Sequence, residues 1–315
     1  MSPRVLFVYN PVARGVPSLD RIRSAVSWLE GQGWEASLEA TAASMHATEL
    51  AREAARKEYE VVAACGGNGT LSEVANGLAG SPTALAVVPG GTANVWVKEV
   101  RIPRNPLAAA RVIAEGERRQ IDLGLASTEG RFAGGGTDRY FLLMAGVGLD
   151  GLVVGAVPKG LKRRLGALAY ILYGLRGVLS YRAKAAHLLL DGQSLETDLY
   201  WMVVGNTRSY AGVVEITCQA AVDDGRLDLC LFRRQGPLRA VASGIRILAR
   251  RHHRAPDVLY QTVKSIEVRA PVLPVQMDGE YMGETPMTFR AVPGALHVIV
   301  PAGLQSPLFT GSPVE

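Results

Sequence analysis

The chain has 315 residues, of which 48% are hydrophobic and 20% charged, and its formal net charge is +5. This composition argues against intrinsic disorder and suits one large domain or two of ordinary size. The positive charge indicates an anionic partner without distinguishing a nucleotide, a nucleic acid and a membrane. The three cysteines, Cys65, Cys218 and Cys230, lack the paired spacing of a metal site and indicate a reducing compartment.

The N-terminal part alternates strand and helix signals. We expect strands at residues 5–9, 34–39, 61–64 and 84–88 and helices at residues 19–30, 47–57 and 107–114. The first apolar run is too short for a secretory signal, so we expect a cytoplasmic protein. Alternation of this kind predicts a doubly wound α/β sheet with a ligand site at the carboxyl ends of its strands.

A glycine-rich loop, residues 66–70, follows the apolar run 61–64. Thr70 or Ser72 is expected to cap the next helix, and Glu73 stands at the capping-box spacing after Thr70. A glycine loop that opens a helix presents free backbone N–H groups and a positive dipole end, which attract phosphate. An ordinary strand–turn–helix connection is the alternative interpretation.

Two more loops, residues 10–15 and 89–94, follow predicted strands in the same part of the chain. The carboxyl ends of parallel strands meet at one edge of a sheet, so we expect both loops to gather beside residues 66–70. Convergence of three loops is stronger evidence for an anion site than any one of them.

The C-terminal half has longer and more β-branched strand signals, separated by Asp-Gly turns. Strands are expected at residues 140–144, 186–190, 199–204, 227–232 and 265–268, with turns at 191–192, 224–225 and 278–279. This pattern predicts a mostly antiparallel β domain.

Two basic segments, residues 158–184 and 235–256, interrupt the β pattern. The apolar portion of the first, residues 165–173, is far shorter than the roughly 20 residues of a membrane span. Basic amphipathic helices of this kind can lie on an anionic membrane surface. They can equally pack on the β domain with solvated charges, and the sequence leaves both interpretations open.

Seven motifs in chain order carry a resemblance to a known family; they lie at residues 10–11, 66–78, 91–94, 122–124, 145–150, 223–228 and 277–280. With these motifs the chain resembles the bacterial diacylglycerol kinase and sphingosine kinase-like lipid kinases over essentially its full length. The resemblance implies an ATP- and Mg²⁺-dependent kinase that phosphorylates a lipid hydroxyl at an anionic membrane surface, from the cytoplasmic side of the inner membrane.

The same resemblance implies an α/β nucleotide-binding domain at residues 1–123 and a β-sandwich at residues 124–303, with catalysis between them. The tail, residues 304–315, either returns to the first domain or is a loose end. Oligomeric state is open, with a homodimer as one option. Nucleic acid is not an expected partner, because the sequence contains no recognised reader module.

Site residues follow from the resemblance, position by position. Glu280 is expected to accept the proton of the lipid hydroxyl, with Asp278 beside it on the same face of a strand. A Mg²⁺ site is expected at Asp224, with the carbonyls of Ala221 and Arg226. Nucleotide contacts are expected from Asn10, Pro11, Val12, Ala13, Arg14, Thr41, Gly66, Gly67, Asn68, Gly69, Thr70, Leu71, Ser72, Glu73 and Thr92. Without the resemblance, the favoured interpretation of the acidic residues near Asp224 and near Asp278 is a tight hairpin turn.

Two departures from the family pattern bear on the phosphate loops. Asn68 stands where the family has an aspartate, and Arg14 stands where a small residue is common. The amide keeps the shape of the carboxylate but loses its charge, so we expect nucleotide binding to survive better than catalysis. Arg14 either contacts the phosphates or crowds them.

Three other functions compete with the lipid kinase. A NAD kinase-like enzyme shares the glycine-loop style, and a nucleotide- or lipid-binding protein weakened by Asn68 would lack turnover. Residues 146–151 form a literal G-x-G-x-x-G, but β signals follow where a dinucleotide site needs a βαβ unit. We expect these glycines to shape the cleft between the domains instead, where Asp150 could face the substrate.

Overall fold

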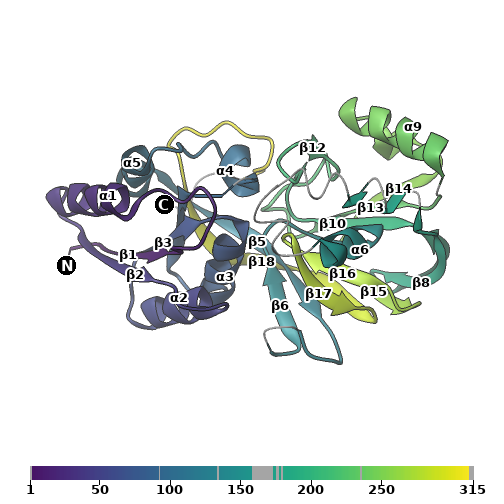
Figure 1. Ribbon diagram of the computed structural model, residues 1–315, viewed down its shortest axis with the longest axis horizontal. Coiled ribbons are helices and arrows are strands. Elements are labelled where there is room, and N and C mark those ends of the chain that lie inside the picture. The colour runs from purple at the N-terminus through teal and green to yellow at the C-terminus, as the bar shows by residue number, and fades with distance from the viewer. Residues whose placement is uncertain are drawn as a thin grey trace. The chain divides into compact units, whose positions relative to one another are not determined.

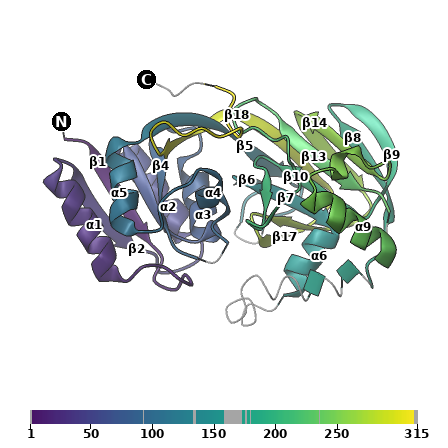
Figure 2. The ribbon, with the colours of Figure 1, turned by 90° about the horizontal axis from the view of Figure 1, so that it is seen from above.

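A computed structural model describes residues 2–91, 93–132, 135–157, 173–174, 177–178, 180–234 and 236–311. The chain divides into two compact units. Unit 1 comprises Met1–Leu123 and Pro293–Glu315, and unit 2 comprises Gly124–Val292. The chain leaves unit 1 within β5 (Glu117–Ser127) and returns to it within β18 (Met287–Val300), two long strands seen in Figure 2.

Unit 1 is a doubly wound α/β domain. Its strands β1 (Arg4–Tyr9), β2 (Glu35–Ala40), β3 (Val61–Gly66) and β4 (Ala84–Pro89) are parallel, in the order β2-β1-β3-β4, and the end of β18 pairs in parallel with β4. The helices are α1 (Leu19–Gly31), α2 (His46–Arg56), α3 (Asn68–Leu78), α4 (Val95–Glu99) and α5 (Pro106–Glu115).

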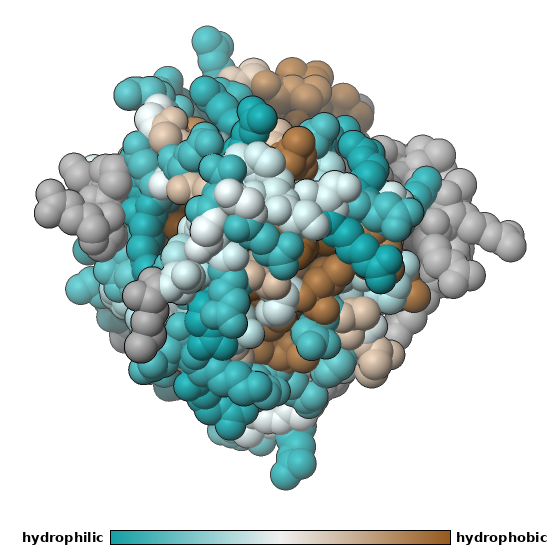
Figure 3. Space-filling model, turned by 90° about the vertical axis from the view of Figure 1, so that its left-hand side faces the viewer, coloured by the Kyte–Doolittle hydropathy of each residue, from teal (hydrophilic) through white to brown (hydrophobic). Residues whose placement is uncertain are grey.

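The helices of unit 1 cover both faces of its sheet. In Figure 1, α1 and α5 lie on one face and α2 and α3 on the other. Every residue of β3 and β4 is buried, which explains why both strands read as continuous apolar runs rather than as alternating patterns. The view in Figure 3 is mostly hydrophilic, with hydrophobic residues confined to smaller areas, as expected where helices turn polar sides to solvent.

Unit 2 is a β-sandwich. One sheet has the order β14-β13-β10-β7-β16-β17, and the other is built on β9, β8, β15 and the first part of β18, with β5 and β6. The bounds are β6 (Asp138–Phe141), β7 (Met144–Gly148), β8 (Lys184–Leu190), β9 (Gln193–Leu199), β10 (Trp201–Gly205), β13 (Leu227–Phe232), β14 (Val258–Val263), β15 (Ser265–Ala270), β16 (Pro274–Met277) and β17 (Glu280–Glu284).

The core of unit 2 lies between these sheets. Leu229 and Val275 from the first sheet pack with Leu188, Ile266 and Phe289 from the second. The unit also contains α6 (Leu149–Ala156), the short hairpin β11 (Ser209–Tyr210) and β12 (Val214–Glu215), α9 (Pro237–Leu248) and a 3-10 turn at His252–Arg254. The fold class expected from the sequence, α/β followed by an antiparallel sandwich, is confirmed.

Two predicted strands of unit 2 are each divided in the structure. The run 140–144 is split between β6, which ends at Phe141, and β7, which begins at Met144. The run 199–204 is interrupted at Tyr200, between β9 and β10. At both places the chain passes from one sheet of the sandwich to the other, which an apolar run does not reveal.

The end of the chain also differs from the predicted boundaries. The second predicted domain extended to residue 303, whereas Pro293 and the residues after it belong to unit 1. The N–H of Gly303 donates to Glu117 (2.6 Å), and the carbonyl of Gly311 accepts from Arg119 (2.8 Å). The described part of the predicted tail therefore lies against unit 1.

The first basic segment, residues 158–184, lies mostly outside the described residues. The second, 235–256, contains α9 and the 3-10 turn. Within the described part of the chain, no helix combines the length and the apolar character that crossing a membrane requires.

Candidate functional site

The glycine loop joins β3 directly to α3. Gly67, in an extended conformation (φ −92°), is the N-cap, and the helix begins at Asn68. Thr70 and Ser72 lie inside the helix and no side chain caps it, so the predicted capping was wrong. The amides of the first turn have no acceptor within the helix, and together with the helix dipole they form a site for an anion.

Thr70 is engaged by the first loop rather than by its own helix. The Nδ2 group of Asn10 donates to the Thr70 hydroxyl (2.9 Å), and the Oδ1 atom of Asn10 accepts the N–H of Val12 (3.1 Å). The backbone N–H of Asn10 donates to the carbonyl of Cys65 (3.0 Å). Asn10 thus joins the loop after β1 to the end of β3 and the first turn of α3.

Close backbone approaches bring the third loop to the other two. Gly91 has φ +114°, and a Cβ atom there would lie 2.8 Å from the Cα atom of Gly67. A Cβ atom on Gly15 would lie 3.5 Å from the amide nitrogen of Gly91. The structure therefore gathers the loops after β1, β3 and β4 at the carboxyl ends of these strands. Thr92 lies outside the described residues.

Asn68 also links two of these loops. Its Oδ1 atom accepts the N–H of Val95, the first residue of α4 (3.2 Å). The preceding residue, Asn94, is left-handed (φ 44°) and donates from Nδ2 to the carbonyl of Gly91 (3.2 Å). An aspartate at position 68 could accept the same N–H, so the amide preserves this link and removes one negative charge.

The other predicted nucleotide contacts of unit 1 divide by exposure. The side chains of Thr70, Leu71 and Ser72 are buried, so this turn offers its main chain rather than its side chains. Pro11, Val12, Ala13 and Arg14 form the more accessible loop, in which Val12 is 85% exposed. Thr41 follows β2, and its N–H donates to the carbonyl of Tyr9 (2.8 Å).

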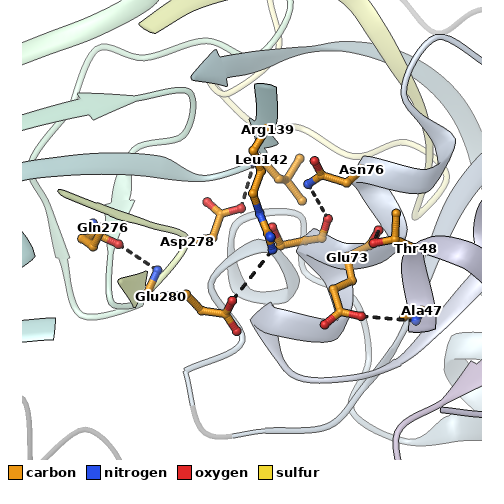
Figure 4. Close-up of polar contacts among 11 residues, drawn as sticks. Ala47, Thr48, Glu73, Asn76, Arg139, Leu142, Gln276, Asp278 and Glu280 are labelled. Carbon is orange, nitrogen blue, oxygen red and sulfur yellow. Dashed lines mark hydrogen bonds and ion pairs between the residues drawn. The ribbon is translucent and has the colours of Figure 1, made fainter. Parts of the chain in front are cut away.

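Glu73 joins α3 to α2. Its Oε2 atom accepts the N–H of Ala47 (3.2 Å), and its carbonyl accepts the Thr48 hydroxyl (2.8 Å), as Figure 4 shows. The expected capping box with Thr70 is therefore absent, because the carboxylate serves the first turn of another helix.

In unit 2, the carboxylate of Asp278 is surrounded by backbone donors. It accepts the N–H groups of Leu142 (3.0 Å), Leu143 (2.9 Å) and Met144 (3.1 Å), and the residue is only 7% exposed. Asp278 has φ +51° and lies in the turn between β16 and β17. The expectation that Asp278 and Glu280 share one face of a strand was wrong, because the left-handed turn separates them.

Glu280 remains accessible. It is the first residue of β17, and its side chain is 47% exposed. Its Oε2 atom lies 3.9 Å from Nη2 of Arg139, a largely buried arginine of β6 (Figure 4). An exposed carboxylate beside a held cation can take a proton from a substrate hydroxyl, whereas the carboxylate of Asp278 is already occupied.

A polar cluster that the sequence reasoning missed supports the same turn. The Nε2 group of Gln276 donates to the carboxylate of Asp150 (2.8 Å), and the Oε1 atom of Gln276 accepts the N–H of Gly279 (2.8 Å). The Tyr210 hydroxyl also donates to Asp150. Burial raises the pKa of the Asp150 carboxyl. A glutamine between the apolar Val275 and Met277, just before an Asp-Gly turn, was the available signal.

The position of Asp150 also explains the G-x-G-x-x-G pattern. A Cβ atom on Gly146 would overlap the Asp150 carboxylate, and β7 is an interior strand of an antiparallel sheet. The glycine therefore accommodates a buried acid. The βαβ setting of a dinucleotide site is not present here. Asp150 is 2% exposed, so its carboxylate does not present a surface to solvent.

The predicted metal ligands lie in the loop before β13. Asp224 is exposed, and its Oδ1 atom accepts the N–H of Arg226 (2.9 Å), while Ala221 is buried. A carboxylate and two carbonyl oxygens are hard ligands that suit Mg²⁺. Among the described residues, no group of three or more His, Cys, Asp or Glu side chains is placed to hold a metal. Backbone carbonyls would therefore have to complete such a site.

Known proteins match this chain across both units. Residues 4–126 match the diacylglycerol kinase catalytic domain, and residues 144–300 match the YegS C-terminal NAD kinase beta sandwich-like domain. A diacylglycerol kinase from Bacillus subtilis (strain 168) is 29% identical over 303 residues, 95% of this chain and 96% of that protein. One from Staphylococcus aureus (strain bovine RF122 / ET3-1) is 30% identical over 306 residues, 96% of this chain and 93% of that protein.

A solved structure shares the fold. The crystal structure of a candidate diacylglycerol kinase from Bacillus anthracis str. Sterne has a TM-score of 0.77 at 23% identity, and the match covers 96% of this chain and 99% of that one.

Proposed function

This chain belongs to the diacylglycerol kinase family and is an ATP-dependent lipid kinase, and we propose that it phosphorylates the hydroxyl of a diacylglycerol-like or sphingoid lipid. The observation that carries the proposal is the meeting of three loops at the start of α3, where Gly67 and Gly91 bring two backbones together. This arrangement suits a triphosphate, because main-chain amides and a helix dipole can offset its charge.

On the nucleotide side, each loop has a separate role in the proposal. Backbone amides of the turn that includes Asn68 and Gly69 hold phosphate oxygens, and Asn10 keeps the first loop against this turn. Arg14 is exposed in that loop and supplies a positive charge for the phosphates. Thr41 and Thr92 complete the proposed nucleotide contacts.

On the acceptor side, we assign the general base to Glu280. The lipid hydroxyl oxygen attacks the γ-phosphorus of ATP, the bond from that phosphorus to the ADP oxygen breaks, and Glu280 takes the hydroxyl proton. The products are ADP and the phosphorylated lipid. Asp278 acts as a positioning residue, because its carboxylate is fully engaged by the N–H groups of Leu142, Leu143 and Met144.

Magnesium enters the proposal in two ways. A Mg²⁺ ion bound with ATP would neutralise charge on the phosphoryl group that is transferred. Asp224, with the carbonyls of Ala221 and Arg226, would hold a further ion that ties together the loop before β13.

We place the enzyme on the cytoplasmic face of the inner membrane, where a lipid acceptor would be found. Asn68 is the residue expected to limit its rate, because the neutral amide links α3 to α4 without the charge of an aspartate. A NAD kinase-like activity is the weaker alternative, since relatives matched over nearly their full length carry the diacylglycerol kinase name.

The test is transfer of labelled phosphate from ATP to a panel of vesicle-borne diacylglycerol, sphingoid base and monoacylglycerol, with NAD as a soluble acceptor. We expect label in a lipid, and loss of transfer on chelation of Mg²⁺. Glu280→Gln should reduce kcat by at least about 100-fold with nucleotide affinity retained, because it removes only the base. Transfer to NAD alone, or full activity of Glu280→Gln, would overturn the proposal.

A further inference from the structure

Helix α9 of unit 2 presents apolar side chains to solvent. Val241 and Ile245 are each 63% exposed and Leu248 is 75% exposed. Their spacing of four and three residues places them on one face of the helix, here called the α9 stripe. Val213, in the β11–β12 hairpin, is also 75% exposed and lines the same hollow as Leu248.

A helix that packs its apolar face on its own domain buries that face, whereas the α9 stripe is exposed. Ile247 is the buried residue of the last turn, and α9 contacts β12 and the 3-10 turn. Figure 1 shows α9 at the periphery of unit 2, beyond β13 and β14. Isolated exposed apolar residues are normal, but a row of them on one helix indicates a surface that contacts another protein or a membrane.

Beside the stripe lies a basic hollow of about 470 Å³, here called the arginine hollow. Its lining residues are Arg234, Arg239, Ala242, Arg246, Pro256 and Asp257. Asp257 is the acid of this set, and its two carboxylate oxygens lie 3.7 Å from Arg239 and 3.6 Å from Arg246. Three guanidinium groups against one carboxylate leave two positive charges in excess.

The charge around the helix has the same sign. Residues 234–257 contain six arginines and a single acid, Asp257. Arg250 pairs with Glu215 (2.8 Å), and the exposed Arg251 and Arg254 extend the basic area beyond the helix. An apolar stripe next to excess arginine complements a surface that is apolar below and anionic above, which describes a bilayer of acidic phospholipids.

We propose that α9 docks unit 2 on an anionic phospholipid bilayer, with the α9 stripe in the headgroup–acyl boundary and lipid phosphates in the arginine hollow. The proposal rests on the proposed function in that the acceptor is a membrane lipid. Guanidinium groups suit this role, because they pair with two phosphate oxygens at once and desolvate more readily than ammonium groups.

The experiment measures sedimentation of the full chain with vesicles of phosphatidylcholine alone or mixed with phosphatidylglycerol. We expect binding to the mixed vesicles only, weakened by salt. Arg239→Gln/Arg246→Gln should lower the partition coefficient about 25-fold, or about fivefold for each basic residue near the surface. Ile245→Ser should lower it about tenfold, and Arg239→Lys/Arg246→Lys should retain most of the binding.

Matched controls separate docking from general charge and apolarity. Arg23→Gln removes an exposed arginine of α1, and Val272→Ser removes an apolar side chain that is 56% exposed elsewhere in unit 2. Both should bind vesicles as the unaltered chain does. Thermal melting and circular dichroism of each variant test whether it is folded.

The proposal would be overturned by equal binding to both vesicle types, by no binding to either, or by normal binding of Arg239→Gln/Arg246→Gln and Ile245→Ser. If the α9 stripe instead joins two copies of the chain, Ile245→Ser should change the mass of the protein in solution and leave its vesicle binding intact. That result would also contradict the proposal. Transfer to a water-soluble short-chain diacylglycerol tests the proposed kinase separately. We expect that activity to be unaffected by Ile245→Ser.

Discussion

The buried carboxylate of Asp278 accepts three backbone N–H groups. The substitution Asp278→Asn replaces one of its two oxygens with an NH₂ group. The asparagine oxygen can still serve Leu143 and Met144, which share Oδ1 in the native turn. The NH₂ group then faces the N–H of Leu142, which now meets a donor in place of Oδ2. The side-chain charge that strengthened all three bonds is lost as well.

The cost of this change can be estimated from those three bonds. A hydrogen bond to a charged group contributes about 1.5–3 kcal/mol, and a buried donor without an acceptor costs about 1–3 kcal/mol. We therefore expect Asp278→Asn to lower the free energy of unfolding by about 3 kcal/mol. For a unit of this size the melting temperature should fall by about 6–12 °C, at 2–4 °C per kcal/mol.

Glu280→Gln is the matched control, because it makes the same chemical change two residues away on a side chain that is 47% exposed. Its effect on unfolding should stay within about 0.5 kcal/mol. Differential scanning fluorimetry of the two variants beside the unaltered chain makes the comparison. If Asp278→Asn melts within about 2 °C of the unaltered chain, the structural role given to Asp278 is refuted.

Three further predictions concern the phosphate loops and pH. Asn68→Asp should raise kcat in the labelled-ATP assay, because it restores a charge while keeping the acceptor at Oδ1; an unchanged rate would reject this account of the substitution. Gly91→Ala should weaken nucleotide binding at least about tenfold by calorimetry, because its Cβ atom would press on Gly67. The control is Gly80→Ala, which also has a positive φ but lies in open space and should bind the nucleotide normally. Burial lowers the pKa of His252 below its usual 6.5, so the unfolded chain takes up the proton first as pH falls. The free energy of unfolding should therefore decrease as pH falls below about 6.5. In urea titrations, His252→Phe should lose less of this free energy than the unaltered chain over the same interval.

Much of unit 1 was predictable from the sequence because its signals are local. Each apolar run that ended in glycine or proline became a buried parallel strand, as β3 and β4 illustrate. The start of α3 was misplaced for a reason outside the segment. Threonine is a residue type that commonly caps helices, but the Thr70 hydroxyl accepts a hydrogen bond from Asn10, sixty residues earlier in the chain. The competition between a local cap and a distant amide is not visible in the sequence.

Unit 2 was harder to predict because its important contacts are long-range. The division of the run 199–204 at Tyr200 depends on two sheets that exist only after folding. The role of Asp278 likewise depends on N–H groups about 135 residues away, at Leu143 and its neighbours. An Asp-Gly pair correctly predicted a turn, but it carried no information about where the aspartate would point.

The turn between β16 and β17 therefore combines two acids with opposite requirements. A general base needs access to its substrate, whereas a carboxylate that holds three backbone amides must be buried and kept charged. The left-handed residue Asp278 meets the second requirement by directing its side chain inward, and the next strand begins with Glu280 outside. On the other side of the turn, Asp150 holds Gln276, and the Oε1 atom of Gln276 accepts the N–H of Gly279. The backbone before Glu280 is therefore fixed by hydrogen bonds that do not involve the Glu280 carboxylate.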